Sequence, residues 1–76
     1  MPISLKDLKV GDTARVAGYS ENGEYASQLM RLGLIPGTRI EVRRMAPLGD
    51  PMEIRVGDSY VTLRKREAAQ IETSPV

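Results

Sequence analysis

The sequence predicts a mainly β fold: a small, strongly bent antiparallel barrel of about five strands, with one short α-helix inserted after the first strand. Short segments in which apolar and polar residues alternate recur along the 76 residues. Gly, Pro and Asp separate these segments and mark turns. Only one segment has the period of a helix. A chain of this length is expected to form a single domain, residues 1–76, with a thin core.

The first elements are a capped turn and a strand. Residues 4–8 (SLKDL) have the S-x-x-D pattern that caps a helical turn, here with two leucines directed inward. Residues 13–19 (TARVAGY) then alternate, with Ala14 and Val16 on one face. This alternation predicts the first strand.

A single amphipathic helix is expected to follow from Ser20. Apolar residues in this segment recur at the spacing of one helical face, which predicts a stripe that packs on the core. The members of the stripe are Tyr25, Leu29 and Leu32, broadened by Ala26 and Met30.

The end of this helix is marked by a glycine and a proline. Gly33 stands where a left-handed residue ends a helix, and Leu34 is placed to contact Leu29, as in a Schellman motif. Pro36 prevents the helix from continuing, and Gly37 supplies the positive φ of a turn.

The second strand is predicted over residues 38–45 (TRIEVRRM), with Ile40 and Val42 inward. Met45 breaks the alternation. Either a bulge returns it to the core, or it lies on the outer face beside the next loop.

The remaining elements form a hairpin and a short C-terminal strand. Residues 52–56 and 59–63 are separated by Gly-Asp, a two-residue connection typical of hairpins. Residues 65–70 are expected to form one helical turn, and Ile71 to face inward from a short last strand. Residues 73–76 are expected to be a frayed tail.

Residues 46–51 (APLGDP) are too many for a tight hairpin, and prolines stand near both ends. Pro47 and Pro51 restrict φ and remove hydrogen-bond donors, so the loop is expected to hold one shape outside the sheet. A pre-ordered loop loses less entropy when a partner binds. Leu48 is expected either to be exposed on this loop or to fold back as a plug beneath it.

The residue types exclude most catalytic chemistry. The chain has no His and no Cys, and hence lacks the common general bases and nucleophile pairs. The carboxylate pairs Glu21–Glu24 and Asp50–Glu53 are interpreted as surface charge, and no phosphate-binding glycine motif is present. The sequence therefore predicts a protein that is not an enzyme.

A metal site is the next alternative. Two acids and two methionines cluster in sequence around the loop and could hold a divalent cation weakly, but without imidazole or thiolate they are interpreted as structural. These residues are Met45, Asp50, Met52 and Glu53.

Net charge, aromatic content and hydropathy limit the kinds of partner and the cellular location that the sequence supports. Eleven Lys and Arg against ten Asp and Glu give a net charge of +1, and the chain has three Tyr and no Phe or Trp. A nucleic-acid-binding barrel is therefore a weaker alternative, because such sites use excess cations and aromatic platforms. No apolar run is long enough to span a membrane, and no signal peptide is apparent, which favours a cytoplasmic location.

Taken together, these segments resemble the ferrous iron transport protein A (FeoA) family. The resemblance spans about residues 5–72 and rests on RLGLIPG, APLGDP and LRKREA in this order, preceded by SLKDLKVGDTARV. It implies an SH3-like barrel. It also implies a cytosolic accessory protein, an adaptor or regulator that binds the cytosolic part of a membrane ferrous iron transporter with a nucleotide-binding domain.

The resemblance also leaves an alternative function open. The fold is similar to the C-terminal domain of iron-dependent repressors, so a transition-metal-binding regulatory domain stays an alternative. Self-association through a strand edge also stays open. The residues expected to contact the partner lie in the two matching loop segments: Leu34, Ile35, Pro36, Pro47, Leu48, Gly49, Asp50 and Pro51.

Overall fold

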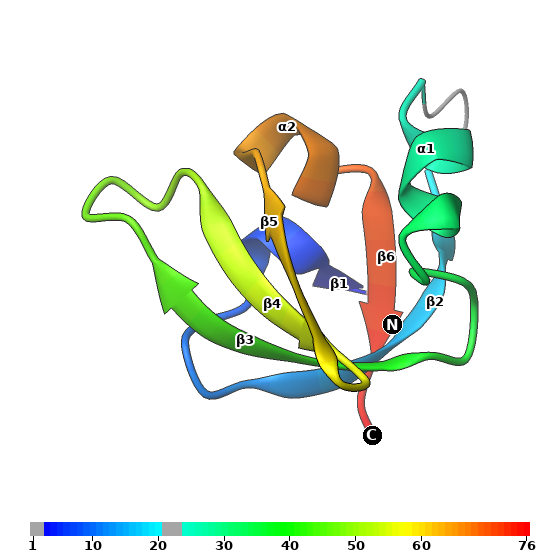
Figure 1. The fold of residues 1–76 in the computed structure, drawn as a ribbon, viewed down its shortest axis with the longest axis horizontal. Coiled ribbons are helices and arrows are strands. Elements are labelled where there is room, and N and C mark those ends of the chain that lie inside the picture. Colours follow the sequence, from blue (N-terminus) through cyan, green and yellow to red (C-terminus); the bar gives the residue numbers. More distant parts are fainter. Residues whose placement is uncertain (1–2, 21–23) are drawn as a thin grey trace.

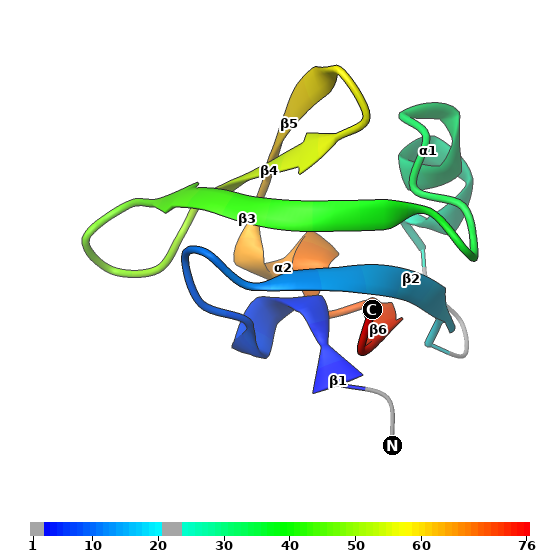
Figure 2. The ribbon, with the colours of Figure 1, turned by 90° about the horizontal axis from the view of Figure 1, so that it is seen from below.

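Six strands form one antiparallel sheet in the order β1-β6-β2-β3-β4-β5 within residues 3–20 and 24–76, which the computed structural model describes. The sheet bends strongly around one core, which confirms the predicted fold class (Figures 1 and 2). Within this part of the chain, no helix has the length and apolar composition needed to cross a membrane. The elements in chain order are β1 (Ile3–Ser4), the 3-10 turn η1 (Leu5–Asp7), β2 (Thr13–Tyr19), α1 (Ala26–Arg31), β3 (Arg39–Met45), β4 (Met52–Val56), β5 (Ser59–Leu63), α2 (Lys65–Ala68) and β6 (Ile71–Ser74).

The N-terminal segment contains a strand that the alternation did not predict. Ile3 pairs with Thr73 across β1 and β6, and a strand of two residues is too short to show a period. The predicted cap is confirmed, since the Ser4 hydroxyl accepts a hydrogen bond from the Lys6 amide at 3.4 Å. Leu5 is fully buried.

Strand β2 has the predicted bounds and joins two parts of the sheet. Its first residues pair with β3 and its last with β6. The register with β6 shifts between Val16 and Gly18. Such an irregularity increases local bending, which lets β2 serve both neighbours as the sheet curls.

Helix α1 is shorter than predicted. It begins at Ala26, and the backbone N–H of Ser20 donates instead to the Gln70 carbonyl at 2.8 Å; residues 21–23 lie outside the described residues. The predicted stripe is also too wide. Leu29 is fully buried, but Met30 is exposed, and Leu32 is 46% exposed because it is the C-cap, where the helical path has ended.

The predicted end of α1 is confirmed in detail. Gly33 has φ +98°, and its N–H donates to the Met30 carbonyl at 3.0 Å. The N–H of Leu34 donates to the Leu29 carbonyl at 3.3 Å. These are the two hydrogen bonds of a Schellman motif, and they direct Leu34 into the core beside Leu29.

A bulge in β3 explains the broken alternation at Met45. The register with β4 shifts between Val42 and Arg44, so that Met45 pairs with Met52 and packs against the core. The bulge alternative is therefore confirmed. Without the extra residue, Met45 would face outward at the base of the following loop.

The C-terminal third contains the predicted hairpin, helical turn and strand. β4 and β5 pair from Val56 opposite Ser59, with Gly57 at φ +61° in the two-residue connection. The expected tail is wrong in its first two residues. Thr73 is buried and Ser74 pairs with Arg15, so β6 continues to Ser74.

The core lies inside the curled sheet, with α1, α2 and η1 each contributing a buried residue. Most of it consists of the inward residues of the five longer strands, as the alternation predicted. The buried cluster is Leu5, Val16, Leu29, Leu34, Ile40, Val42, Met52, Ile54, Val61, Leu63, Ala68 and Ile71.

Candidate partner-binding surface

The proline loop, residues 46–51, is held by its own backbone. The Ala46 amide donates to the Pro51 carbonyl at 3.0 Å, which closes the base of the loop next to the Met45–Met52 pair. The Gly49 amide donates to the Ala46 carbonyl at 2.7 Å, and Gly49 has φ +82°. Residues 46–49 therefore form a hydrogen-bonded turn at the tip, in line with the predicted fixed shape.

A third hydrogen bond connects the proline loop to α2. The Asp50 carboxylate accepts from the Lys65 amide at 3.0 Å. This amide is in the first turn of α2, where backbone donors have no partner within the helix. The Arg64 amide is satisfied by the Glu67 side chain at 2.7 Å. Asp50 thus caps a helix that lies fifteen residues further along the chain.

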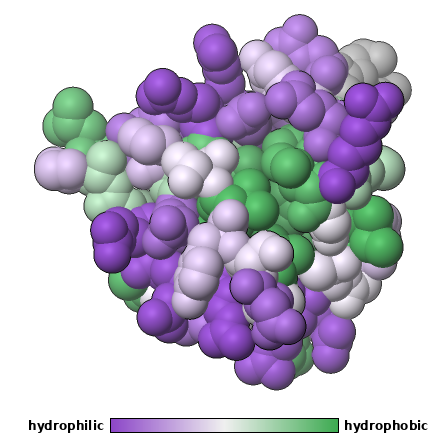
Figure 3. All heavy atoms as spheres, in the orientation of Figure 1, coloured by the Kyte–Doolittle hydropathy of each residue, from purple (hydrophilic) through white to green (hydrophobic). Residues whose placement is uncertain are grey.

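Leu48 projects from the tip of the proline loop. It is 91% exposed, so it is not a plug beneath its own loop. Figure 3 shows apolar atoms at the tip of this loop, beyond the body of the molecule. Only contact with another molecule would remove the Leu48 side chain from water. Because such burial is favourable, this position favours partner binding.

An apolar groove lies next to the base of the proline loop. It has a volume of about 370 Å³ and follows the ends of β3 and β4. Apolar side chains supply most of its lining, and its far end reaches β5. The lining residues are Arg44, Met45, Ala46, Pro47, Pro51, Met52, Glu53 and Thr62.

A basic pocket lies where the proline loop meets α2 and η1. It has a volume of about 550 Å³, and four of its six lining residues are cationic. Within the described residues, only Lys6 of these four makes an ion pair, with Asp7 at 3.1 Å. The pocket therefore favours an acidic group. Its lining is Lys6, Asp50, Arg64, Lys65, Arg66 and Ala69.

The other predicted contact segment lies at the opposite end of the molecule. Leu34 is fully buried, so its assignment to the contact surface is wrong, whereas Ile35 is 51% exposed and Pro36 is exposed. Figures 1 and 2 both place the turn after α1 at one end of the longest axis, which extends 29 Å, and the proline loop at the other. The two segments do not form one surface.

The turn after α1 is fixed by a half-buried phenol. The Tyr19 hydroxyl donates to the Leu34 carbonyl at 2.5 Å. Burial raises the pKa of Tyr19 above its ordinary value of 10.0, because the charged phenolate would lose hydration there. The exposed Met30 and Leu32, which the helical stripe placed in the core, lie in the same region as Ile35.

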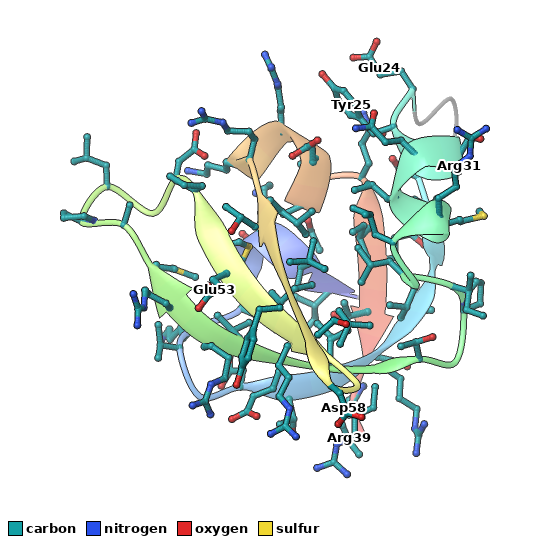
Figure 4. All side chains as sticks on the ribbon, in the orientation of Figure 1. Glu24, Tyr25, Arg31, Arg39, Glu53 and Asp58 are labelled. Carbon is teal, nitrogen blue, oxygen red and sulfur yellow. The ribbon has the colours of Figure 1, made fainter. Side chains whose placement is uncertain are left out.

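The acidic residues considered for catalysis or metal binding do not converge. Within the part of the chain that is described, no three acidic side chains come close enough together to hold a metal ion. Asp50 lines the basic pocket, whereas Glu53 lines the apolar groove. Figure 4 shows Glu24 in the turn before α1 and Glu53 on β4, well apart, and Glu21 lies outside the described residues.

Comparison with known proteins adds to this geometry. The sequence matches the FeoA domain family over residues 3–75. This chain belongs to the FeoA domain family. It is 35% identical over 68 residues to the Fe(2+) transport protein A/Fe(2+) transporter FeoB fusion protein of Porphyromonas gingivalis. The match covers 90% of this chain and 8% of that protein, so the chain spans a small part of the relative's length.

Solved FeoA structures have the same fold. Iron(II) transport protein A of Clostridium thermocellum is 40% identical, with a TM-score of 0.88 over 97% of this chain and 46% of that one. Stenotrophomonas maltophilia FeoA, solved with zinc and described as a procaryotic SH3 domain protein, is 26% identical, with a TM-score of 0.79 over 97% and 89% of the two chains. The FeoA match and the SH3-like fold confirm both expectations.

The expected structural relation to metal-dependent repressors is also found. A manganese-dependent transcriptional repressor has a TM-score of 0.88 over 99% of this chain and 37% of its own, at 18% identity. This likeness concerns the fold alone.

The sequence did not indicate which residues surround the proline loop. The run of basic residues after β5 was visible, but the contact between Lys65 and Asp50 depends on how the sheet curls. The methionines that line the apolar groove were visible only as ambiguous core residues. Gly49 and Pro51 are half-buried and shape the loop from within, whereas Pro47, Leu48 and Asp50 are exposed.

Proposed function

We propose that this FeoA domain is a cytoplasmic, non-catalytic accessory protein of ferrous iron transport. It acts as an adaptor or regulator by binding the cytosolic part of a membrane ferrous iron transporter that carries a nucleotide-binding domain. The family and the fusion of a related domain to a transporter in one protein support this function. In the fusion protein, the FeoA part and the transporter part belong to one polypeptide, which supports a direct contact between them.

The observation that carries the proposal is the exposed Leu48 on a loop fixed by three hydrogen bonds. The loop holds its shape before a partner arrives, so binding requires little further ordering. The same loop helps to line the apolar groove, through Pro47 and Pro51, and the basic pocket, through Asp50. The complementary surface on the transporter is therefore an apolar side chain or pair of side chains next to an acidic group.

Ile35 and Pro36 form a second, separate contact in this proposal. They lie too far from the proline loop to bind the same patch of a partner. A transporter whose cytosolic part is larger than this domain, or a second protein, would occupy this end.

Metal-responsive regulation is the other candidate function. The repressor-like fold is its support, and the donor set weighs against it, because the chain offers neither imidazole nor thiolate. Anaerobic titration with Fe²⁺ decides between the two functions. Saturable amide shifts at micromolar metal would favour a metal sensor. Steep, salt-dependent binding to a nucleic-acid resin would instead favour a nucleic-acid-binding barrel, which we do not expect.

The proposed contact is tested with the detergent-solubilised transporter from the same organism. Affinity is measured by surface-based binding for the wild type, Leu48→Ser and Leu48→Asp. We expect Leu48→Ser to weaken binding by about tenfold from lost apolar burial. Leu48→Asp should weaken it more because the new carboxylate enters an interface built for an apolar side chain.

The matched variant is Ile35→Asp, which places the same charge on an exposed apolar residue at the opposite end. A loss with both Asp variants assigns both ends to the transporter, and a loss with Leu48→Asp alone assigns the proline loop. Undiminished binding by both Leu48 variants, with unchanged melting temperatures, would refute the proline loop as the contact.

A further inference from the structure

Within residues 3–20 and 24–76 the sheet has two edges, and only one of them is long enough there to bind another strand. β1 ends one side with two residues. β5 ends the other side with five residues, Ser59–Leu63, and pairs only with β4 within the described chain. An edge of this length presents a row of backbone donors and acceptors to its surroundings.

The register identifies the free groups on β5. In a hairpin with a two-residue connection, the residues next to the turn exchange both backbone hydrogen bonds, and the pattern alternates from there. The pairs Val56–Ser59 and Ile54–Val61 are therefore hydrogen-bonded. Tyr60 and Thr62 direct their N–H and C=O groups away from β4, and within the described residues no hydrogen bond uses them.

This edge lacks the features that protect sheet edges from pairing. Its sequence, SYVTL, contains no charged residue and no proline. The register shifts of the sheet lie in the β2–β6 and β3–β4 pairs, and none lies in β4–β5. The hairpin also projects from the rest of the sheet (Figure 2), and apolar atoms gather between β5 and β6 (Figure 3).

We propose that the β5 edge binds the β5 edge of a second copy of this chain, in antiparallel register about a two-fold axis at Val61. In this register Tyr60 lies opposite Thr62 of the partner subunit, and the reverse pair forms by symmetry. All four free backbone groups of each β5 then find partners, giving four intermolecular hydrogen bonds. Each Tyr60 ring, 57% exposed in the single chain, packs against a β-branched side chain.

Charge complementarity favours a second copy and fixes the register. With Val61 on the axis, Asp58 lies opposite Arg64 of the partner subunit, and this pair occurs twice. Asp58 stands at the hairpin turn (Figure 4), and Arg64 continues the extended path of β5, with φ −73° and ψ 153°. Neither side chain makes an ion pair within the described residues. A shift by two residues would lose two of the hydrogen bonds and both charge pairs.

Charge exchange tests the pairing with the isolated chain, without any transporter, so its result is independent of the proposed function. The variants are Asp58→Arg, Arg64→Asp and an equimolar mixture of the two. Sedimentation equilibrium measures self-association up to millimolar protein. Each variant alone places like charges opposite each other twice, and should weaken dimerisation by at least about tenfold. The mixture restores two opposite pairs and should form a heterodimer of wild-type affinity.

A second variant, Thr62→Pro, blocks the edge without using the charges. Its missing N–H faces away from β4, so the ladder inside the chain keeps its hydrogen bonds and proline is tolerated there. We expect a monomer with a melting temperature close to that of the wild type. A wild-type chain that stays monomeric at millimolar concentration, or a dimer that all of these variants leave unchanged, would overturn the proposal.

Discussion

The Asp50 carboxylate and the Lys65 backbone amide, 3.0 Å apart, connect the proline loop to the first turn of α2. One side chain thus holds a loop in place and caps a helix. Because the loop carries Leu48 and the helix supplies cations to the basic pocket, this hydrogen bond fixes the two halves of the candidate surface relative to each other.

Replacing Asp50 should loosen both segments at once. Asp50→Ala removes the acceptor, and we expect the free energy of unfolding to fall by about 0.5–1 kcal/mol. Hydrogen exchange should become faster at the Lys65 and Gly49 amides, measured by NMR. Asp50→Asn keeps an acceptor oxygen and should have a smaller effect. Unchanged exchange at Lys65 in Asp50→Ala would mean that the hydrogen bond does not hold α2.

The basic pocket predicts that partner binding depends on charge. Arg66→Glu should weaken binding to the transporter several-fold and reduce its salt dependence, because it reverses a cation at the edge of the contact. Arg39→Glu is the matched control, since Arg39 lies at the far end of β3, away from the pocket (Figure 4). Equal losses in both variants would indicate a general charge effect instead of a defined pocket.

Two leucines in and next to α1 should differ sharply in their effect on stability. Leu29 is fully buried, so Leu29→Ala should lower the free energy of unfolding by about 2–5 kcal/mol. Leu32 is half-exposed at the cap, and Leu32→Ala should change it by no more than about 0.5 kcal/mol. Urea unfolding followed by circular dichroism measures both values. A similar loss of unfolding free energy in both variants would mean that Leu32 packs in the core, as the helical stripe predicted.

Replacing Gly33, the residue with positive φ after α1, by any other residue should destabilise the fold. Gly33→Ala should cost about 1–2 kcal/mol because φ is +98°, although the added carbon would lie 3.6 Å from Val56 in ordinary contact. Gly18→Ala serves as the control, since its φ is not in the left-handed region and open space surrounds its position. Thermal unfolding of the two variants should rank them in this order. A neutral Gly33→Ala would contradict the Schellman motif as the cause.

Tyr19 should make stability fall at alkaline pH. Its pKa is raised in the folded state, so the folded chain holds the proton more tightly than the unfolded chain. The stabilisation is therefore complete below the unfolded value, near 10.0, and decreases as the pH rises through the folded value. Tyr19→Phe should be less stable by about 1 kcal/mol at neutral pH, since the Leu34 carbonyl loses its donor. The difference between the two proteins should shrink above pH 10, as measured by urea unfolding.

Elements with strong local signals were predictable, and those set by distant contacts were not. The alternation around Val16, Ile40 and Ile54 located three strands, and Gly33 located the end of α1. β1 was missed because its two residues carry no period and depend on Thr73. Leu32 was misplaced because the length of a helix depends on where its caps form, and here the helix ends one residue earlier.

The candidate surface was predictable only as separate pieces. Pro47 and Pro51 indicated a fixed loop, and Leu48 followed as its exposed tip. The prediction that this loop and the turn at Ile35 form one contact surface was wrong. Which segments lie next to each other in space depends on the direction in which the sheet curls. Leu34 could have been recognised as core from its place in the Schellman motif, which directs that residue toward Leu29.

The pairing of β1 with β6 brings the first and last strands of the domain together, with Ile3 beside Thr73. The start of β1 and the end of β6 therefore lie in the same region of the body, remote from the proline loop (Figure 1). A longer polypeptide could contain this domain at its N-terminus, at its C-terminus or as an insertion in a surface loop without distorting the fold. Wherever it is attached, Leu48 would still face away from the tether.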